Sequence, residues 1–194
     1  MKHFLCGVAV AGVASLALLV SAPAGWARPG QEDRTHSFEG NCSVEGPVTF
    51  DPPATDQQQR LDVDYTATGT CSGTLDGASV SDAPVTMHNR AVSDGSCLHA
   101  QTITPGRGAM RFAGGATVAY TFEFTYVGTD GVLTFNGNRS GSALGHGSFV
   151  TPHSSPEAAQ GCSDGTGVRQ IPMVIQLVTQ SPLVSSAHSR QTQR

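Results

Sequence analysis

The chain has 194 residues, of which 38% are hydrophobic and 13% charged, and its formal net charge is −4. This length suggests one domain or at most two small ones, and so few charges argue against a coiled coil or a long solvated helix. Patterned apolar clusters and a small net charge argue against a disordered chain. The acidic excess, 15 Asp and Glu against 11 Lys and Arg, argues against nucleic acid or an anionic membrane as the main partner.

The first 27 residues have the order of a secretory signal peptide. A short basic start, Met1-Lys2-His3, precedes an apolar run over residues 5–20 and a stretch of small residues over 21–27. The small-x-small rule allows cleavage after Ala27 or after Ala24, and we favour Ala27. Because the apolar run is short and a proline-containing spacer follows it, we expect a secreted chain with no membrane span in its mature form.

Four cysteines remain after this segment, and we expect them to form disulfides. An even number of cysteines in an exported chain is typical of a disulfide set, and their spacing contains no CxxC cluster of the kind that binds zinc. Four cysteines allow three connectivities. We favour Cys42–Cys71, because both residues lie in strand patterns that would be neighbours, and Cys97–Cys162, because both lie in Gly- and Ser-rich stretches that need tying down.

From about residue 36 the apolar pattern has a period of two, which predicts strands and no helix. The clearest strand before residue 100 has Leu61, Val63, Tyr65 and Ala67 on one face. Weaker strands are expected at 38–44, 48–50, 83–92, 98–103 and 109–113.

The strongest alternation of the chain starts at Val118. Alternate residues from there to Tyr126 share one face, Asp130-Gly131 follows as a hairpin signal, and residues 132–135 alternate again. Residues 118–136 are therefore predicted to be a β-hairpin. Two more strands are expected at 142–150 and 171–177, the latter covered on both faces.

Gly and Pro pairs separate these patterns at short intervals, as in a fold built from hairpins. The expected turns are Gly46-Pro47, Pro52-Pro53, Asp76-Gly77, Pro105-Gly106 and Gly114-Gly115. The fold class predicted is all-β, either an antiparallel β-sandwich or an up-and-down or jelly-roll-like barrel of about eight or nine strands, stabilised by disulfides. We expect one domain over residues 36–180, flexible segments at 28–35 and 181–194, and a long loop at 151–167.

No motif for nucleophilic catalysis is complete. Gly161-Cys162-Ser163-Asp164-Gly165 has the Gly-x-Ser-x-Gly spacing of a nucleophile elbow, but the sequence predicts no helices alternating with strands, so the α/β-hydrolase fold is excluded on pattern. A triad assembled from distant segments would draw its base and hydroxyl from His88, His99, His146, His153, Ser142 and Ser148. A hydrolase with a site in the 146–164 region, around His146, His153 and Asp164, is one alternative hypothesis.

Two further kinds of site can be considered from the residue types. Asp62 and Asp64 share one strand face about 7 Å apart, which is read as a solvated polar face rather than a Ca²⁺ site. No metal or cofactor is expected. The only tryptophan, Trp26, belongs to the signal segment, which argues against a tryptophan-lined sugar site.

A carrier of a small apolar ligand in a barrel lumen is the other alternative. The three tyrosines fall on predicted core faces, at positions 65, 120 and 126. The side chains expected to face inward are those of Tyr65, Phe112, Tyr120, Phe122, Phe124, Phe135, Met173 and Ile175.

The signal segment, the Cys-Ser pairs at residues 42–43 and 71–72, the sequence GNRSGSA at 137–143 and the ending SPLV at 181–184 carry a resemblance. The chain is similar to small secreted proteins of high-GC Gram-positive bacteria, over about residues 40–185. This resemblance implies an exported all-β domain and transfers no catalytic residue. The leading hypothesis is a secreted, non-enzymatic β domain that binds an extracellular ligand or an envelope component.

Overall fold

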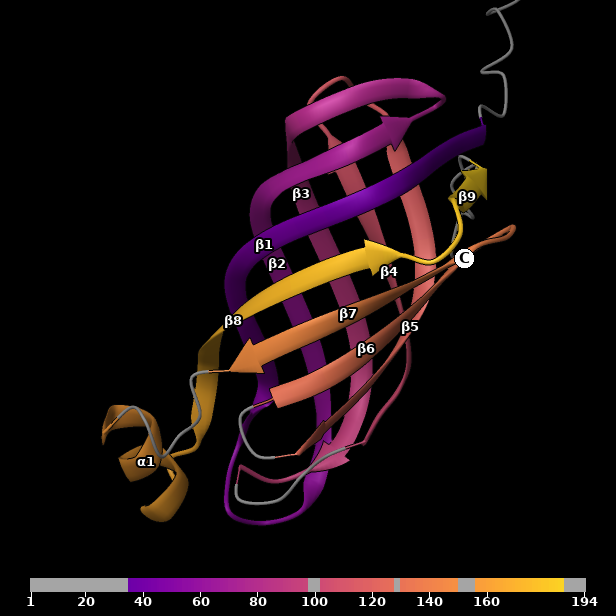
Figure 1. Cartoon of the computed structure of the whole chain (residues 1–194). Coiled ribbons are helices and arrows are strands. Elements are labelled where there is room, and N and C mark those ends of the chain that lie inside the picture. Colours follow the sequence, from indigo (N-terminus) through magenta and orange to yellow (C-terminus); the bar gives the residue numbers. More distant parts are fainter. Residues whose placement is uncertain (1–34, 98–101, 128–129, 150–155, 187–194) are drawn as a thin grey trace, which may run out of the picture. The chain divides into compact units, whose positions relative to one another are not determined.

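The computed structural model describes residues 35–97, 102–127, 130–149 and 156–186, which contain nine strands and one short helix (Figure 1). The elements are β1 (Thr35–Ala54), β2 (Gln59–Leu75), β3 (Ala78–Gly95), β4 (Thr102–Phe112), β5 (Thr117–Val127), β6 (Asp130–Gly137), β7 (Ser142–Phe149), α1 (Pro156–Ser163), β8 (Val168–Thr179) and β9 (Leu183–Ser186).

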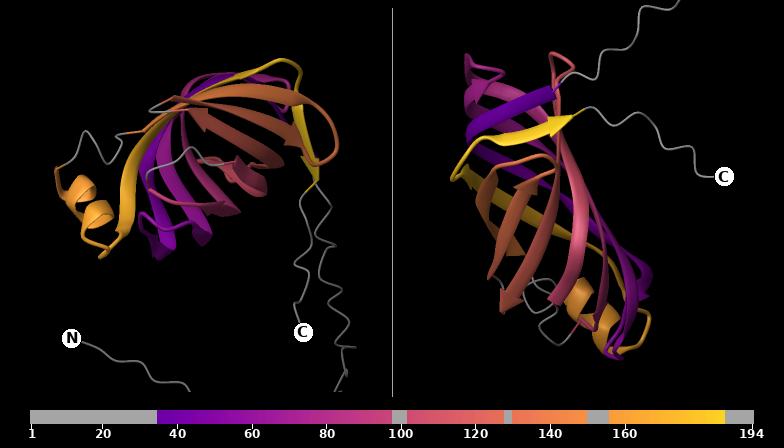
Figure 2. Two further views of the ribbon diagram at one scale, coloured as in Figure 1. Left: turned by 90° about the horizontal axis from the view of Figure 1, so that it is seen from below. Right: turned by 90° about the vertical axis from the view of Figure 1, so that its right-hand side faces the viewer.

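The first eight strands form a closed antiparallel barrel. Each strand pairs with the next along the chain, and β8 returns to pair with β1, so that β1 lies between β2 and β8 (Figure 2). The all-β class and the barrel option are therefore confirmed, and a sandwich is not seen. Both architectures share the period-two pattern, and only the pairing of the first strand with the eighth distinguishes them.

The alternating faces expected from the sequence point into the barrel. Leu61, Val63, Tyr65 and Ala67 of β2 are buried, as are the residues from Val118 to Phe124 on the same face of β5. The predicted hairpin is the pair β5–β6, in which Phe122 lies opposite Phe135. One face of β8 departs from expectation, because Val178 points outward and is exposed and Val174 is only half-buried.

Strands β1 and β4 run through three of the expected turns, because Gly46-Pro47 and Pro52-Pro53 lie inside β1 and Pro105-Gly106 lies inside β4. Gly46-Pro47 lies inside β1, where the ladder to β2 pairs residues on either side but not these two, so the missing N–H of proline costs little there. Pro105-Gly106 lies inside β4, at a register irregularity between Ile103 and Gly106. The ring of Phe122 occupies the position that a side chain at Gly106 would take, so this glycine serves packing rather than a turn.

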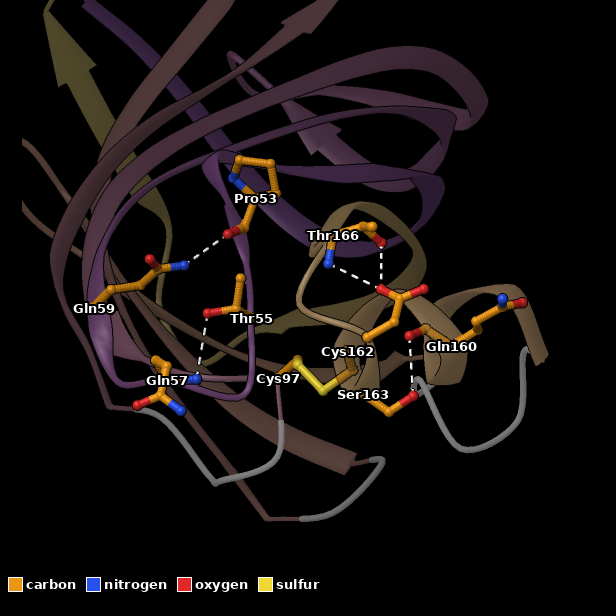
Figure 3. Close-up of a disulfide and its surroundings, with 10 residues drawn as sticks. Pro53, Thr55, Gln57, Gln59, Cys97, Gln160, Cys162, Ser163 and Thr166 are labelled. Atoms are coloured by element: carbon orange, nitrogen blue, oxygen red, sulfur yellow. Dashed lines mark hydrogen bonds between the residues drawn. A yellow bond between two sulfur atoms is a disulfide. The ribbon is translucent and has the colours of Figure 1, made fainter.

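The segment 151–167, expected as a loop, contains α1. A helix of eight residues is too short to show a 3.6-residue period in an eleven-residue window. Proline is favoured at the first helical position, where its missing N–H is not needed. Figure 3 shows that Cys162 of α1 forms a disulfide with Cys97, which attaches the helix to the end of β3. Within α1, Ser163 Oγ donates to Gln160 O at 3.0 Å.

The other disulfide lies inside the barrel. Cys42 of β1 and Cys71 of β2 are directly opposite in the ladder, their Cα atoms are 4.1 Å apart, and both side chains are buried. The two disulfides are the pairs favoured from the sequence. Each closes a loop in the unfolded chain, of 29 and 65 residues in sequence separation, and so reduces the entropy gained on unfolding.

The domain continues past residue 180, so the expected flexible segment at 181–194 is wrong for β9. Leu183 is completely buried, and β9 pairs with the start of β1 from Thr35↔Ser186 to Phe38↔Leu183. Ser185 Oγ also donates to Thr117 O of β5 at 3.1 Å. A four-residue strand with two serines is too short to show an alternating pattern, and the residues after 186 lie outside the described part. Within the described ranges, no helix has the length and apolar character to cross a membrane.

Glycines on β7 provide a test of the packing inside the barrel. A Cβ atom added at Gly145 would lie 2.7 Å from Phe135 Cε2. We expect Gly145→Ala to lower the free energy of unfolding by about 1–3 kcal/mol, as overpacking does. Gly114→Ala, where a Cβ meets nothing within 4 Å, is the matched control. Urea denaturation measures both, and a Gly145→Ala variant as stable as its control would contradict this account of the packing.

The start of β1 is held to the β2–β3 turn by hydrogen bonds to Asp76. His36 Nδ1 lies 2.7 Å from Asp76 Oδ2, and Ser37 N–H donates to Asp76 Oδ1 at 2.8 Å. Partial desolvation raises the pKa of Asp76, but the hydrogen bonds from His36 and Ser37 outweigh it, so the net pKa is lowered from 3.8. A carboxylate with a lowered folded-state pKa stabilises the fold above its unfolded pKa and loses this effect as pH falls through the folded value.

We therefore expect Asp76→Asn to destabilise the domain at pH 7 by less than about 1 kcal/mol, because the Asp76 side chain is 42% exposed and solvent weakens its interactions. The difference from the wild type should vanish as pH falls from about 4 toward 2. Urea denaturation at several pH values measures it. Asp82→Asn, also at a positive φ, controls for the amide substitution itself. A difference that persists at the lowest pH would show that the charge of Asp76 is not its source.

Candidate functional site

The residues proposed for a hydrolase site are not brought together in the described part. His146 lies on the outer face of β7, with Nε2 3.4 Å from Asp130 Oδ1. Asp164 follows α1 and accepts hydrogen bonds from Thr166 N–H at 2.9 Å and Thr166 Oγ1 at 2.6 Å, which lower its pKa. His153 and His99 lie outside the described residues. In the described part no contact joins His146 to Asp164, so the hydrolase hypothesis gains no geometric support.

The serines considered as nucleophiles have other neighbours. Ser142 N–H donates to Ser181 Oγ at 3.0 Å, at the junction between β7 and the end of β8. Ser148 is exposed on β7, opposite Asp130 on one side and Val174 on the other.

The side chains expected to face inward occupy the interior of the barrel. All eight are buried, from Tyr65 on β2 to Ile175 on β8. Tyr120 and Phe135 are in edge-to-face contact with ring centroids 5.2 Å apart, and Phe122 lies 6.3 Å from Phe135. The ring of Phe135 packs directly against the backbone of Gly145, where a side chain would otherwise lie. The side chain of Tyr126 lies outside the described part.

Two buried tyrosine hydroxyls have partners across the interior. Tyr120 OH donates to Asn89 Oδ1 at 2.7 Å, and Tyr65 OH donates to Met173 O at 3.3 Å. Burial raises the pKa of both phenols. In the described part no buried side-chain N or O atom lacks a hydrogen bond. Around these two tyrosines the barrel interior is a packed core. These residues therefore give no support to the prediction of a ligand in the lumen.

An open groove lies on the strands β1 to β4, and its rim is charged. We call it the charged groove. Its lining residues are Thr49, Phe50, Asp51, Asp62, Val63, Asp64, His88, Arg90, Ala91, Val92, Pro105, Gly106, Arg107, Gly108 and Ala109. The polar members alternate with core residues along each strand, so their side chains point outward. The polar face predicted for Asp62 and Asp64 is part of this groove.

Asp64 is the centre of a hydrogen-bonded network in the charged groove. Its Oδ2 accepts from Arg90 Nε at 2.8 Å and lies 3.6 Å from His88 Nε2. Thr66 Oγ1 lies 3.3 Å from Asp64 Oδ1 and 2.9 Å from His88 Nδ1. Asp64 is 35% exposed and Arg90 75% exposed, so the carboxylate orients a guanidinium group that is largely in solvent.

Two pairs of like charges face each other across neighbouring strands of the groove. Asp51 of β1 is directly opposite Asp62 of β2, and Arg90 of β3 is directly opposite Arg107 of β4. Like charges in directly opposite positions of an antiparallel pair are destabilising. Asp64 offsets part of the repulsion at Arg90, whereas Arg107 has no ion pair or side-chain hydrogen bond among the described residues.

The groove offers a surface for binding charged groups, and nothing in the described ranges marks it as a metal centre. No group of three or more His, Cys, Asp and Glu side chains in those ranges is arranged to hold a metal ion. The opposed arginines were missed in the sequence analysis, because the register of β3 against β4 cannot be read from residues 17 positions apart. The only signal in the sequence was that β3 and β4 each carry an arginine, Arg90 and Arg107, at an outward position.

Comparison of the chain with protein-family models, with curated proteins and with solved structures finds no match. The geometry of the barrel and of the charged groove therefore carries the functional argument.

The opposed arginines predict a measurable effect on stability. We expect Arg107→Gln to raise the free energy of unfolding by up to about 0.5 kcal/mol at low salt, because it removes a like-charge pair. The gain should shrink in high salt, which screens exposed charges. Arg111→Gln is the matched control, because Arg111 is on the same strand and face but lies opposite Thr86 and Thr117. Denaturation of both variants at two salt concentrations tests this, and a loss of stability in Arg107→Gln would refute the repulsion.

Proposed function

We propose that this chain is an exported, non-enzymatic binding module of the bacterial cell envelope, and that its ligand binds in the charged groove. In this proposal the barrel is a rigid scaffold and not a container. The observation that carries the proposal is the placement of Asp51 opposite Asp62 and of Arg90 opposite Arg107 in one open groove.

The energetic argument is that these charges oppose folding but favour binding. A polar residue at any of the four positions would avoid the repulsion without disturbing the core, since all four side chains point outward. Charged groups gain most when a ligand of opposite charge approaches them in a concave surface, where the field is focused. Residues that destabilise the fold locally, as these like-charge pairs do, are typical of functional sites.

Export is supported by two independent features of the chain. The signal-peptide order of residues 1–27 is the first. The second is the presence of two disulfides, which form and persist in oxidising compartments. Neither feature depends on the charged groove, so export and ligand binding can be tested separately.

The proposal predicts that the protein sediments with cell-wall sacculi through the groove. Protein recovered from the culture medium of an expressing host is mixed with purified sacculi of a Gram-positive bacterium, and the pelleted fraction is measured. Thr49→Trp places a bulky ring in the groove, and we expect it to reduce the affinity at least about fivefold, because it blocks access to the charged side chains. Thr86→Trp is the matched control, since Thr86 is also an exposed strand threonine but does not line the groove.

Wild-type protein that stays in the supernatant would overturn envelope binding. Equal sedimentation of Thr49→Trp and the wild type would overturn the groove as the binding surface. The mass of the recovered protein tests export in the same experiment, because cleavage after Ala27 leaves a chain that starts at Arg28.

A further inference from the structure

We infer that Arg90 and Arg107 together bind one carboxylate group of the ligand, and that the ligand carries no second negative charge beside it. This inference rests on the proposed function, because it names the chemical group that the charged groove would recognise. It concerns the basic half of the groove, on β3 and β4.

The two guanidinium groups are placed for joint binding of one anion. Directly opposite residues of an antiparallel pair have Cβ atoms about 4.5–5.5 Å apart and project to the same side. Asp64 engages Arg90 through Nε alone, at 2.8 Å, so both Nη groups of Arg90 have no partner among the described residues. Neither does any nitrogen of the Arg107 side chain. Both arginines therefore present unused N–H donors at the same place on the sheet.

The residue type also matters. Arginine presents a planar fork of donors that matches the two oxygens of a carboxylate, whereas lysine acts as a point charge. Because Asp64 holds Arg90 from the side of β2, part of the conformational entropy of that side chain is lost before a ligand arrives. A carboxylate placed between Arg90 and Arg107 would turn their mutual repulsion into two attractive contacts.

The acidic half of the groove limits which anions can bind. By strand geometry Asp62 lies about 12 Å from Arg107, two strands and two residues away, and Asp51 lies one strand further, about 16 Å from Arg107. Asp64 lies closer still, at the position directly opposite Arg90. A polyanion such as a phosphodiester polymer would place further negative charges near these three carboxylates. A single carboxylate on an otherwise neutral or cationic ligand avoids that repulsion.

A peptide carboxylate provides a simple probe. The exported protein is labelled with ¹⁵N, and the arginine Nε–Hε signals are followed by NMR during titration with N-acetyl-tetraalanine. The C-terminal amide of the same peptide lacks the charge, and inorganic phosphate is the competing oxyanion. We expect saturable shifts of the Arg90 and Arg107 signals with the carboxylate, with a dissociation constant of about 1–10 mM, and no saturable shift with the amide.

The matched variants of the stability test serve here as well. Arg107→Gln should weaken carboxylate binding at least about tenfold, whereas Arg111→Gln should leave it unchanged. Equal binding of the amide, or equal binding by Arg107→Gln, would overturn the inference. Phosphate that binds at these arginines more tightly than the carboxylate would overturn the assignment to a carboxylate.

The sacculus experiment separates this inference from the proposed function. If Thr49→Trp loses sedimentation but Arg107→Gln keeps it, the groove binds its ligand without the arginine pair, and only the further inference fails. If the carboxylate probe binds as expected but wild-type protein does not sediment, the envelope proposal fails and the carboxylate site stands.

Discussion

Closure of the sheet by β1 is the constraint on which the rest of the structure depends. One strand of 20 residues carries hydrogen bonds to β2 along one edge and to β8 along the other, and to β9 near its start. Closure removes the free edges that an open sheet would expose. It also encloses an interior, where the alternating apolar faces of the strands meet, and leaves the opposite, mainly polar faces in contact with solvent. The charged groove exists because β1 to β4 run side by side, which brings the acidic pair of β1 and β2 next to the basic pair of β3 and β4.

Much of the fold could be predicted from the alternation of residues along the chain. The face of β2 around Tyr65 and the β5–β6 hairpin were predicted because each has one buried side. The disulfide Cys42–Cys71 was favoured because its two strands were expected to be neighbours. The disulfide Cys97–Cys162 was favoured because it would anchor two Gly- and Ser-rich stretches. The errors arose where local signals competed with tertiary pairing. Gly46-Pro47 and Pro105-Gly106 have the composition of turns, but the neighbouring strands hold them in extended conformation. The short elements α1 and β9 have too few residues to show a period.

The candidate site was harder to predict from the sequence than the fold. Asp62 and Asp64 could be placed on one face from their spacing, and His88 could be named from its residue type. That Arg90 lies opposite Arg107 depends on the register of β3 against β4, where an irregularity follows Arg90. Register of this kind is set by packing of the inward side chains, because a slip by one residue would turn the apolar face outward. The functional argument therefore depends on a pairing that no local pattern encodes.

The pairing of β9 with the start of β1 has a mechanical consequence. Thr35 and Ser186 are direct partners in an antiparallel ladder, so the two ends of the domain leave it about 5 Å apart. Tension applied through both ends would load the β1–β9 hydrogen bonds one after another, as in a zipper, instead of all at once in shear. A polypeptide into which this domain was inserted would gain a folded side branch while its own contour remained almost unchanged. Such a branch could present the charged groove at a distance from the main chain without lengthening the path between the flanking segments.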